Sequence, residues 1–365
     1  MRAARSVGAA VAVTAAVVLT GVTPAQAAEG VVLGAADANA VKDSYIVVLK
    51  DNATDRGDLA RRYSGTVDRV YTRNLAGFSV HLDEKHAKRL AADTAVAFVE
   101  QDKTVRTEAV QQNPPSWGLD RIDQRNLPLD SKYTYATTAS HQGFDFVDND
   151  TNADDGYGHG THVAATIAGS QYGVAKGAQL YPVRVLGSDG SGTTAGVIAG
   201  VNWITANAKK PAVANASLGG GVSTALDTAV RNSIAAGVTW AVAAGNSNAN
   251  ASTSSPARVA EAITVAAADK TDTRASFSNY GAGVDLFAPG VGITSAWNTN
   301  DTATYTGNGT SFASPHVAGA AALYLATHTT ATAAQVAQAL ISASTPNLVK
   351  NPGSGSPNRT LYVAP

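Results

Sequence analysis

Between residues 180 and 290 the chain alternates short apolar runs with longer segments of helical character. The apolar runs, which we expect to be strands, cover residues 180–186, 212–218, 238–243 and 261–267. Strands that are apolar along their length are buried on both faces, as in a parallel sheet with helices on each side. We expect helices over residues 194–208 and between Ser223, a predicted N-cap, and Gly237, whereas residues 284–287 lead into a loop. The pattern predicts an α/β fold with its chemistry at the carboxyl ends of the strands.

Composition excludes several classes of protein. The 365 residues are 44% hydrophobic, with 27 Lys plus Arg, 28 Asp plus Glu, a net charge of −1 and no Cys. A near-neutral chain lacks the basic surface of a nucleic-acid-binding protein, and this apolar fraction is too high for a disordered one. Without Cys there is no disulfide scaffold, no thiol nucleophile and no thiolate-bound zinc.

The first 27 residues have the pattern of a cleaved export signal. Arg2 and Arg5 precede a run of small and apolar residues over 9–22, and Ala25 and Ala27 form an A-x-A cleavage site. The alternative, a membrane anchor, needs about 20 apolar residues, and this run is shorter. We therefore expect a secreted, extracellular protein with no membrane segment.

A small module follows the signal. Strands are expected over residues 45–50, 77–82 and 96–100, and helices over 58–63 and 84–92. This β-α-β-α-β order predicts a ferredoxin-like α+β unit of the split βαβ kind. The polar, Pro-rich residues 111–115 mark a boundary, so we divide the mature chain into residues 28–110 and 111–365.

The first chemical motif surrounds His159, which lies between Gly158 and Gly160 at the start of a predicted helix. Glycines on both sides let the imidazole approach another backbone closely. A lone histidine at such a place is more often a cap or a core residue. A zinc site with His162 is disfavoured, because the spacing is three residues and no Glu stands where a zinc-binding helix needs one.

Two further motifs lie at similar places. Ser311 stands at a predicted helix start, with Pro315 in the first turn, where the helix dipole would stabilise an oxyanion. Its alternative role is an N-cap. Asn246 follows the strand over residues 238–243 and could donate to charge forming beyond the sheet; seen alone, it is an ordinary turn residue.

In this order and context the three motifs resemble the subtilases, the subtilisin-like serine proteases, and most closely their proteinase K-like branch. The resemblance spans essentially the whole chain. It implies a subtilisin-like parallel sheet flanked by helices and preceded by an inhibitor-like propeptide. It also implies that His159 is the general base, Ser311 the nucleophile and Asn246 the side-chain donor of the oxyanion hole.

The resemblance implies further residues and partners. The residues that bind substrate would be Gly190, Ser191 and Gly192 at the edge that pairs with the substrate backbone, and Ser217, Leu218, Gly219, Ala243, Ala244 and Gly245 in the S1 walls. Catalysis would need no cofactor, and a structural Ca²⁺ would be held by Asp285 and the main-chain oxygens of Ala260 and Ala262. We expect a monomer that acts on proteins or peptides, prefers apolar or aromatic P1 residues, and uses its own propeptide as inhibitor and folding aid.

Two departures from the family stand out. Phe312 replaces the Met that many relatives carry, which removes an oxidisable thioether beside Ser311. More seriously, no Asp-Thr-Gly or Asp-Ser-Gly triplet lies between Trp117 and His159, as if the strand that bears the acid were lost near Ser140.

Asp148 could replace the missing acid only if residues 144–147 moved into the vacant central position of the sheet. Only ten residues separate Asp148 from His159, whereas parallel crossovers take a dozen or more. An empty position would leave two strand edges unpaired. The acidic cluster from Asp145 to Asp155 is otherwise a solvated loop or a cation site.

Three functional hypotheses follow. The leading one is a secreted serine endopeptidase made as a self-inhibited precursor. The second is a catalytically impaired pseudoprotease or truncated product, because the acid motif is missing. The third, a Ca²⁺- or peptide-binding module without catalysis, is disfavoured by the joint presence of His159, Ser311 and Asn246.

Overall fold

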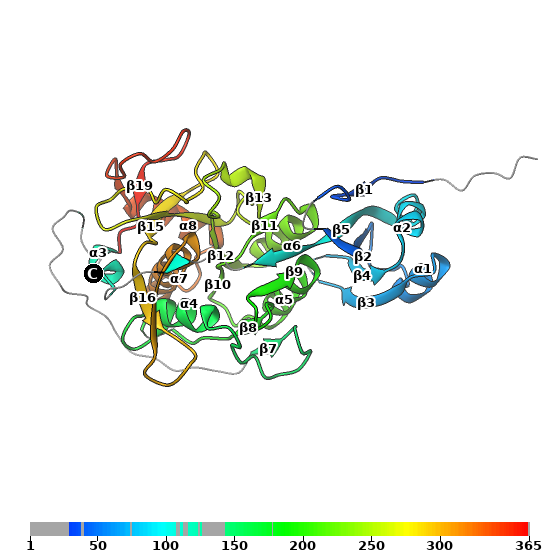
Figure 1. The fold of residues 1–365 in the computed structure, drawn as a ribbon, viewed down its shortest axis with the longest axis horizontal. Helices are drawn as coiled ribbons and strands as arrows, with labels where there is room; N and C mark the ends of the chain where they lie inside the picture. The colour runs from blue at the N-terminus through cyan, green and yellow to red at the C-terminus, as the bar shows by residue number, and fades with distance from the viewer. Residues whose placement is uncertain are drawn as a thin grey trace, which may run out of the picture.

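The structure is a computed structural model that describes residues 29–37, 40–73, 75–106, 110–111, 116–122, 125, 143–176 and 178–363. The predicted signal over residues 1–27 and the junction near Ser140 lie outside these residues. Figure 1 shows a small module beside a larger body, joined through the helices that face the module. Each part has a sheet of its own.

The small module contains two strands more than the sequence pattern predicts. Its elements are β1 (Val32–Leu33), β2 (Ala40–Leu49), α1 (Arg56–Arg62), β3 (Thr66–Tyr71), β4 (Gly77–His81), α2 (Glu84–Ala91) and β5 (Val96–Arg106). The strands follow the order β1-β5-β2-β4-β3, with β2, β3, β4 and β5 paired antiparallel. Of the two unpredicted strands, β1 has only two residues, and β3 lies at the edge, where exposed Asp68 and half-buried Arg69 weaken the apolar signal. From β2 onward the order of elements is thus β-α-β-β-α-β, that of a ferredoxin-like unit.

Both helices of the module begin at an aspartate. The side chain of Asp55 accepts a hydrogen bond from the Asp58 N–H at 2.7 Å, and Asp83 accepts one from the His86 N–H at 2.9 Å. Each cap satisfies a donor that the first helical turn leaves unpaired. The apolar faces of the two helices pack with the inner face of the sheet.

The larger body is built on the predicted parallel sheet. Its strands are β10 (Ala212–Ala216), β12 (Val238–Ala243), β14 (Ile263–Ala268), β15 (Leu286–Pro289), β19 (Arg359–Thr360) and β18 (Thr345–Pro346), in that order across the sheet. All neighbours are parallel except β18 and β19. Residues 284–287, expected to lead into a loop, instead enter β15, whose four residues are all buried. This prediction was wrong because a short, wholly buried strand has no alternating pattern.

Helices cover both faces of this sheet (Figure 1). They are α3 (Gly118–Ile122), α4 (His159–Ala168), α5 (Thr194–Asn207), α6 (Thr224–Ala235), α7 (Thr310–Thr327) and α8 (Ala333–Ala343). The predicted caps of α6 are confirmed: Ser223 Oγ accepts from the Leu226 N–H at 3.2 Å, and Gly237 has φ +91°. That left-handed conformation favours glycine.

Short strands and one 3₁₀ turn complete the body. They are β6 (Val110–Gln111), β7 (Phe144–Asp145), β8 (Val183–Arg184), β9 (Ser191–Thr193), β11 (Gly220–Gly221), η1 (Ala251–Thr253), β13 (Ser254–Ser255), β16 (Ile293–Ala296) and β17 (Thr304–Asn308). The strand expected over residues 180–186 is only the two-residue β8. It pairs with β7 alone, in parallel, and neither strand joins the large sheet. Phe144 and Asp145 therefore lie on the outer side of β8.

The module and the body share one apolar core. Ile46, Val48 and Tyr71 of the module pack in the same cluster as Ile198 of α5 and Leu226 of α6. Because side chains from both parts form this cluster, separating the parts would expose apolar surface on each.

Two carboxylates of β5 reinforce this contact. Glu100 accepts a hydrogen bond from the Ala225 N–H of α6 at 2.9 Å, and Asp102 accepts one from the Ala195 N–H of α5 at 3.0 Å. Both carboxylates are buried, and burial raises the pKa of each despite these N–H donors. The module thus contributes an anion to the positive end of each helix that it covers.

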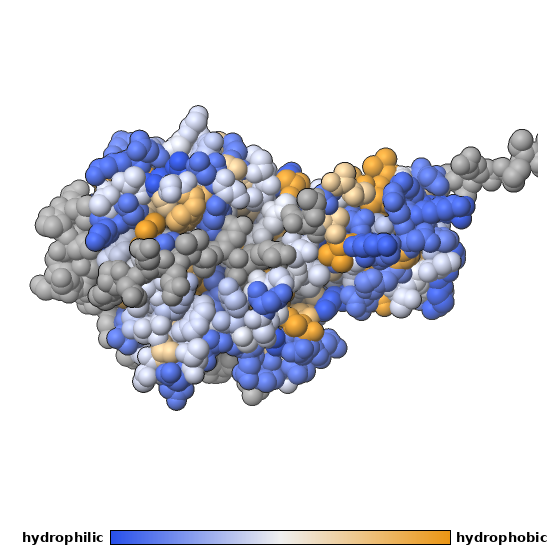
Figure 2. Space-filling model, in the orientation of Figure 1, coloured by the Kyte–Doolittle hydropathy of each residue, from blue (hydrophilic) through white to orange (hydrophobic). Residues whose placement is uncertain are grey.

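The surface is mostly polar. Figure 2 shows hydrophilic residues over most of the visible face, with only small hydrophobic areas. Exposed large apolar side chains, such as Val31 and Val70, are scattered. Within the described ranges, each helix is too short or too polar to span a bilayer.

The ion pair of Arg121 with Asp272 offers a test of the core. Arg121 is 1% exposed, and its Nε donates to Asp272 Oδ1 at 2.8 Å. Asp272→Asn removes the charge that balances this guanidinium while keeping a residue that tolerates the φ of +57° at this position. We expect the free energy of unfolding to fall by about 3 kcal/mol in urea titrations. Exposed Asp301→Asn is the matched control; an equal, small effect of both would contradict the prediction.

Candidate active site

His159 is the first residue of α4, and the turn before the helix determines its position. Gly158 has φ +109°, and a Cβ there would lie 2.2 Å from the ring of Trp297, so only glycine fits. Asp155 closes the turn: its carboxylate accepts from the N–H groups of Tyr157 at 3.0 Å, Gly158 at 2.8 Å and Thr161 at 2.7 Å. Burial acts to raise the pKa of Asp155, but these donors hold it below its usual value. Asp155 therefore serves as the cap of α4.

The imidazole of His159 is buried without a hydrogen-bonded carboxylate. The residue is 5% exposed and packs against Phe312, with 5.6 Å between ring centroids. Its Nε2 has no hydrogen-bond partner among the described residues. Burial lowers the pKa of His159 to about 4, although the charge of Asp155 acts in the opposite direction. The ring is thus neutral at pH 7, the state that a general base requires.

Asp148 does not replace the missing acid. Its carboxylate lies 2.8 Å from Arg184 Nη1 and is 63% exposed. The same guanidinium nitrogen lies 2.6 Å from Asp145. Because β7 pairs on the outer side of β8, residues 144–147 have not moved into the sheet. In the part of the chain that the structure describes, no carboxylate is hydrogen-bonded to His159.

Ser311 is the second residue of α7 and is 2% exposed. Pro315 lies inside the helix, one turn later than the sequence pattern suggested, and has no N–H to donate to the Ser311 carbonyl four residues earlier. Ser217 compensates, because its Oγ donates to that carbonyl at 2.6 Å. The hydroxyl at the end of β10 thus takes the place of the lost helical hydrogen bond and joins the large sheet to the start of α7.

Asn246 is attached to the same helix start. Its Oδ1 accepts from both the N–H and the hydroxyl of Thr310, each at 2.8 Å. The Thr310 hydroxyl in turn accepts from the Gly245 N–H at 3.1 Å. These bonds fix the carboxamide beside Ser311 with its oxygen anchored, so that the amide nitrogen is the donor end. Sequence reasoning missed Thr310, whose signal was its place directly before Ser311.

A cavity of about 340 Å³ opens beside Ser311. Four of the predicted S1 residues line it, namely Leu218, Gly219, Ala243 and Gly245. The other two do not: Ala244 is fully buried, and Ser217 is engaged with the Ser311 carbonyl. None of the described side chains that line the cavity is charged.

The predicted substrate-pairing edge is already paired. Strand β9, which contains Ser191 and Gly192, is antiparallel to the end of β5, with Thr104 opposite Thr193 and Arg106 opposite Ser191. Gly190 forms the turn before β9, with φ +74°. Thr104 also lines the 340 Å³ cavity. The last strand of the small module thus extends along this edge to the cavity beside Ser311.

The predicted metal site contains one half-buried carboxylate. Asp285 Oδ2 accepts from the Thr264 N–H at 2.8 Å, and burial raises the pKa of Asp285 to about 6. Ala260 is exposed and Ala262 buried. Among the described residues no three His, Cys, Asp or Glu side chains converge on one point. The zinc alternative is weakened further because His162 Nε2 lies 3.0 Å from the Ile293 carbonyl oxygen.

Comparison with known proteins agrees with this geometry. The model of the Subtilase family matches residues 58–360. An extracellular serine proteinase of Thermus sp. (strain Rt41A) is 55% identical over 81% of this chain and 78% of its own length. Alkaline serine exoprotease A of Vibrio alginolyticus is 44% identical over 90% and 68%. The solved structure of a cold-adapted subtilisin-like serine proteinase matches with a TM-score of 0.66 and 50% identity, over 68% of this chain and 98% of that one.

Three buried histidines predict sensitivity to acid. Burial lowers the pKa of His159 to about 4, of His162 to about 3 and of His316 to about 4. The unfolded chain binds protons near pH 6.5 and the folded chain does not, so stability is present above that pH and is lost as the pH falls toward 4. Each histidine contributes about 1.4 kcal/mol per pH unit in this window.

We expect His316→Gln to reduce the pH slope of the unfolding free energy by about one proton between pH 6.5 and 4. His316 Nδ1 contacts the Phe312 carbonyl oxygen at 2.8 Å, a contact that an amide N–H can preserve. Urea titrations at several pH values measure the slope. A slope equal to that of the parent chain would contradict the assignment.

Proposed function

The chain belongs to the subtilase family of serine peptidases, and we propose that it is a secreted serine endopeptidase whose described residues supply every catalytic group except the acid. One observation carries the proposal: Ser311 and Asn246 are fixed at one helix start through Thr310, and the neutral ring of His159 packs against Phe312, the residue after Ser311. Family members need no cofactor for catalysis, and their substrates are proteins.

Each residue has a proposed role. Ser311 attacks the scissile carbonyl carbon, and His159 takes the hydroxyl proton and returns it to the leaving amine. The Asn246 amide and the Ser311 N–H stabilise the oxyanion, aided by the positive end of α7. The carboxyl ends of β10 and β12 thus place Ser217 and Asn246 beside the start of α7.

The missing carboxylate limits the rate. A triad acid orients the imidazole and stabilises its cation. In subtilisin itself, removal of the acid alone lowers kcat by about 3 × 10⁴, which is about 6 kcal/mol. We infer that this chain turns over slowly on its own. The alternative, a pseudoprotease without turnover, is favoured by the same unpaired His159 and is decided by the first test below.

We further propose that residues 28–110 are a propeptide that inhibits the body and assists its folding. The end of β5 pairs with β9 where a substrate strand would lie, which explains the inhibition. The shared apolar core and the caps of α5 and α6 by Asp102 and Glu100 explain the role in folding.

Intact mass after expression in a protease-deficient host tests catalysis. We expect the parent chain to lose residues up to about 110 slowly, whereas Ser311→Ala remains at full length. Ser342→Ala, at an exposed position on α8, is the control and should be processed like the parent. If both the parent and Ser311→Ala remain uncut over days, the pseudoprotease alternative holds.

The cavity beside Ser311 predicts the P1 preference. It holds about 340 Å³ and its walls are small and uncharged, so an apolar or aromatic side chain can be buried there. Burial of such a side chain stabilises the complex by about 1.5–3 kcal/mol. We expect kcat/KM for peptides with Phe or Leu at P1 to exceed that for Asp or Lys by 10-fold or more. Preference for a charged P1 residue would contradict this.

We propose that Asp285 and the carbonyl oxygens of Ala260 and Ala262 bind Ca²⁺. A half-buried carboxylate with its pKa raised to about 6 has charge that a cation can balance, and oxygen donors suit Ca²⁺. Added Ca²⁺ should raise the melting temperature of the parent chain but not that of Asp285→Asn, with Asp301→Asn as control. Equal shifts in all three proteins would refute this site.

A further inference from the structure

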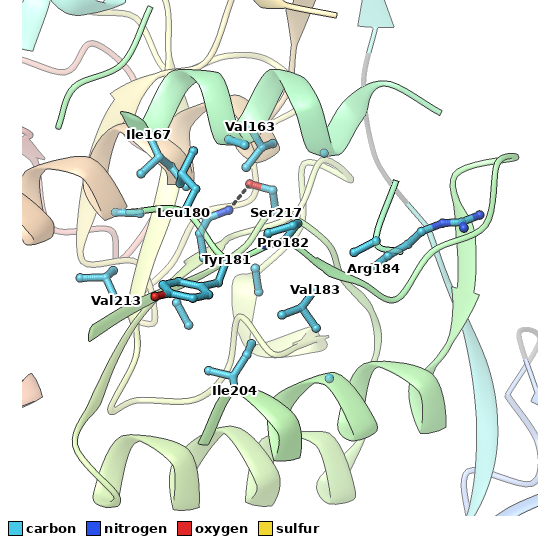
Figure 3. A pocket seen from close by; sticks show the side chains of 18 of the residues that line it. Val163, Ile167, Leu180, Tyr181, Pro182, Val183, Arg184, Ile204, Val213 and Ser217 are labelled. Atoms are coloured by element: carbon cyan, nitrogen blue, oxygen red, sulfur yellow. Dashed lines mark hydrogen bonds between the residues drawn. The ribbon is translucent and has the colours of Figure 1, made fainter. Parts of the chain in front are cut away.

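A second cavity, of about 970 Å³, separates β8 from β10. Residues of both strands line it, including Val183 and Arg184 on one side and Val213 on the other (Figure 3). β8 pairs only with β7, and β10 only with β12, so each strand turns an edge without a partner strand toward the cavity within the described ranges. The backbone N–H and C=O groups of such edges can pair with an added strand.

The dimensions fit one strand. β10 has five residues. An extended segment of that length is about 17 Å long, occupies about 4.8 Å of sheet width and fills about 10 Å between the layers that cover a sheet. The volume of such a segment is therefore about 800 Å³, close to that of the cavity. The chain passes from β8 to β10 through the helix α5, and strands joined by a crossover helix run in the same direction. We therefore expect a strand between β8 and β10 to run parallel to both.

The lining determines the chemistry of the occupant. Val163 and Ile167 of α4 cover the cavity from one side of the sheet and Ile204 of α5 from the other (Figure 3). Both faces of an inserted strand would therefore meet apolar side chains. A strand buried in this way is apolar along its length.

One end of the cavity reaches the candidate active site. His159 lines the cavity and is only 5% exposed. Among the described residues, its Nε2 has no hydrogen-bond partner. Ser217, which follows β10 and donates to the Ser311 carbonyl, also lines it. The carboxyl end of an inserted strand would thus lie near an imidazole that lacks a carboxylate.

We propose that this cavity binds a short apolar β-strand from a second polypeptide, inserted parallel between β8 and β10, with an acidic residue at its carboxyl end beside His159. The inference of a strand site stands on the cavity alone, whereas the use of the acid in catalysis rests on the proposed function. The ligand is thus an extended peptide that provides both main-chain pairing and the missing charge.

Titration of the full chain with the synthetic peptide acetyl-Lys-Lys-Val-Ala-Val-Val-Asp-amide tests the site. The tryptophan fluorescence of Trp203 and Trp240, which line the cavity, reports binding. We expect saturable binding that weakens at least tenfold when the central Ala of the peptide is replaced by Pro, because Pro lacks the N–H. Ile204→Trp, which fills the cavity, should also abolish binding, whereas Val70→Trp on exposed β3 should not.

The acid is tested separately. A peptide that ends in Asn should bind about tenfold more weakly than the Asp peptide to the parent chain, but equally to His159→Ala. NMR should show that the Asp peptide, and not the Asn peptide, raises the pKa of His159 from about 4. Equal affinities and equal titrations in the parent would overturn the contact with His159.

The outcomes distinguish this inference from the proposed function. Absence of saturable binding, or binding that neither Pro in the peptide nor Ile204→Trp weakens, overturns the strand site. Binding of the Asp peptide without faster peptide hydrolysis leaves the strand site standing and counts against the proposed function. Binding together with faster hydrolysis by the parent, and none by Ser311→Ala, supports both.

Discussion

The start of helix α7 is the point on which the site depends, because side chains that follow two different strands of the large sheet hold it. Pro315 removes the donor that would satisfy the Ser311 carbonyl, and Ser217 at the end of β10 supplies another. Asn246, after β12, holds the preceding residue, Thr310. A proline that would weaken an exposed helix therefore ties the backbone of Ser311 to the sheet. The buried surroundings of α7 make this geometry costly to change.

The contact of the small module with α5 and α6 follows similar physics. Helix starts present unpaired N–H groups, and carboxylates of β5 satisfy one on each helix while apolar residues close the surrounding surface. The apolar contact alone would not fix the register of β5 against β9, since apolar contact is not directional. The two caps, Glu100 and Asp102, are two residues apart on one strand and therefore define both position and direction.

Elements with a strong local signal could be predicted from the sequence. Elements whose formation depends on long-range contacts could not. The caps of α6 at Ser223 and Gly237 were predicted correctly because both act within a few residues. β3 and β15 were missed because one lies at a charged edge and the other is buried throughout. Asp155 was assigned to an acidic cluster, although its role is to cap α4. The sequence indicates only that a strand is lacking near Ser140. It does not predict the apolar lining of the cavity between β8 and β10, because that lining comes from the distant helices α4 and α5.

The cavity between β8 and β10 also affects the mechanical properties of the protein. Folded interiors are normally close-packed and almost incompressible, but this body contains a space of about 970 Å³ between two halves of a layer. Unfolding under hydrostatic pressure eliminates the part of this space that water does not fill, so the volume change should lie toward the large end of the usual range. A polypeptide that fills the space would make the protein stiffer and more resistant to pressure, irrespective of any chemistry at Ser311.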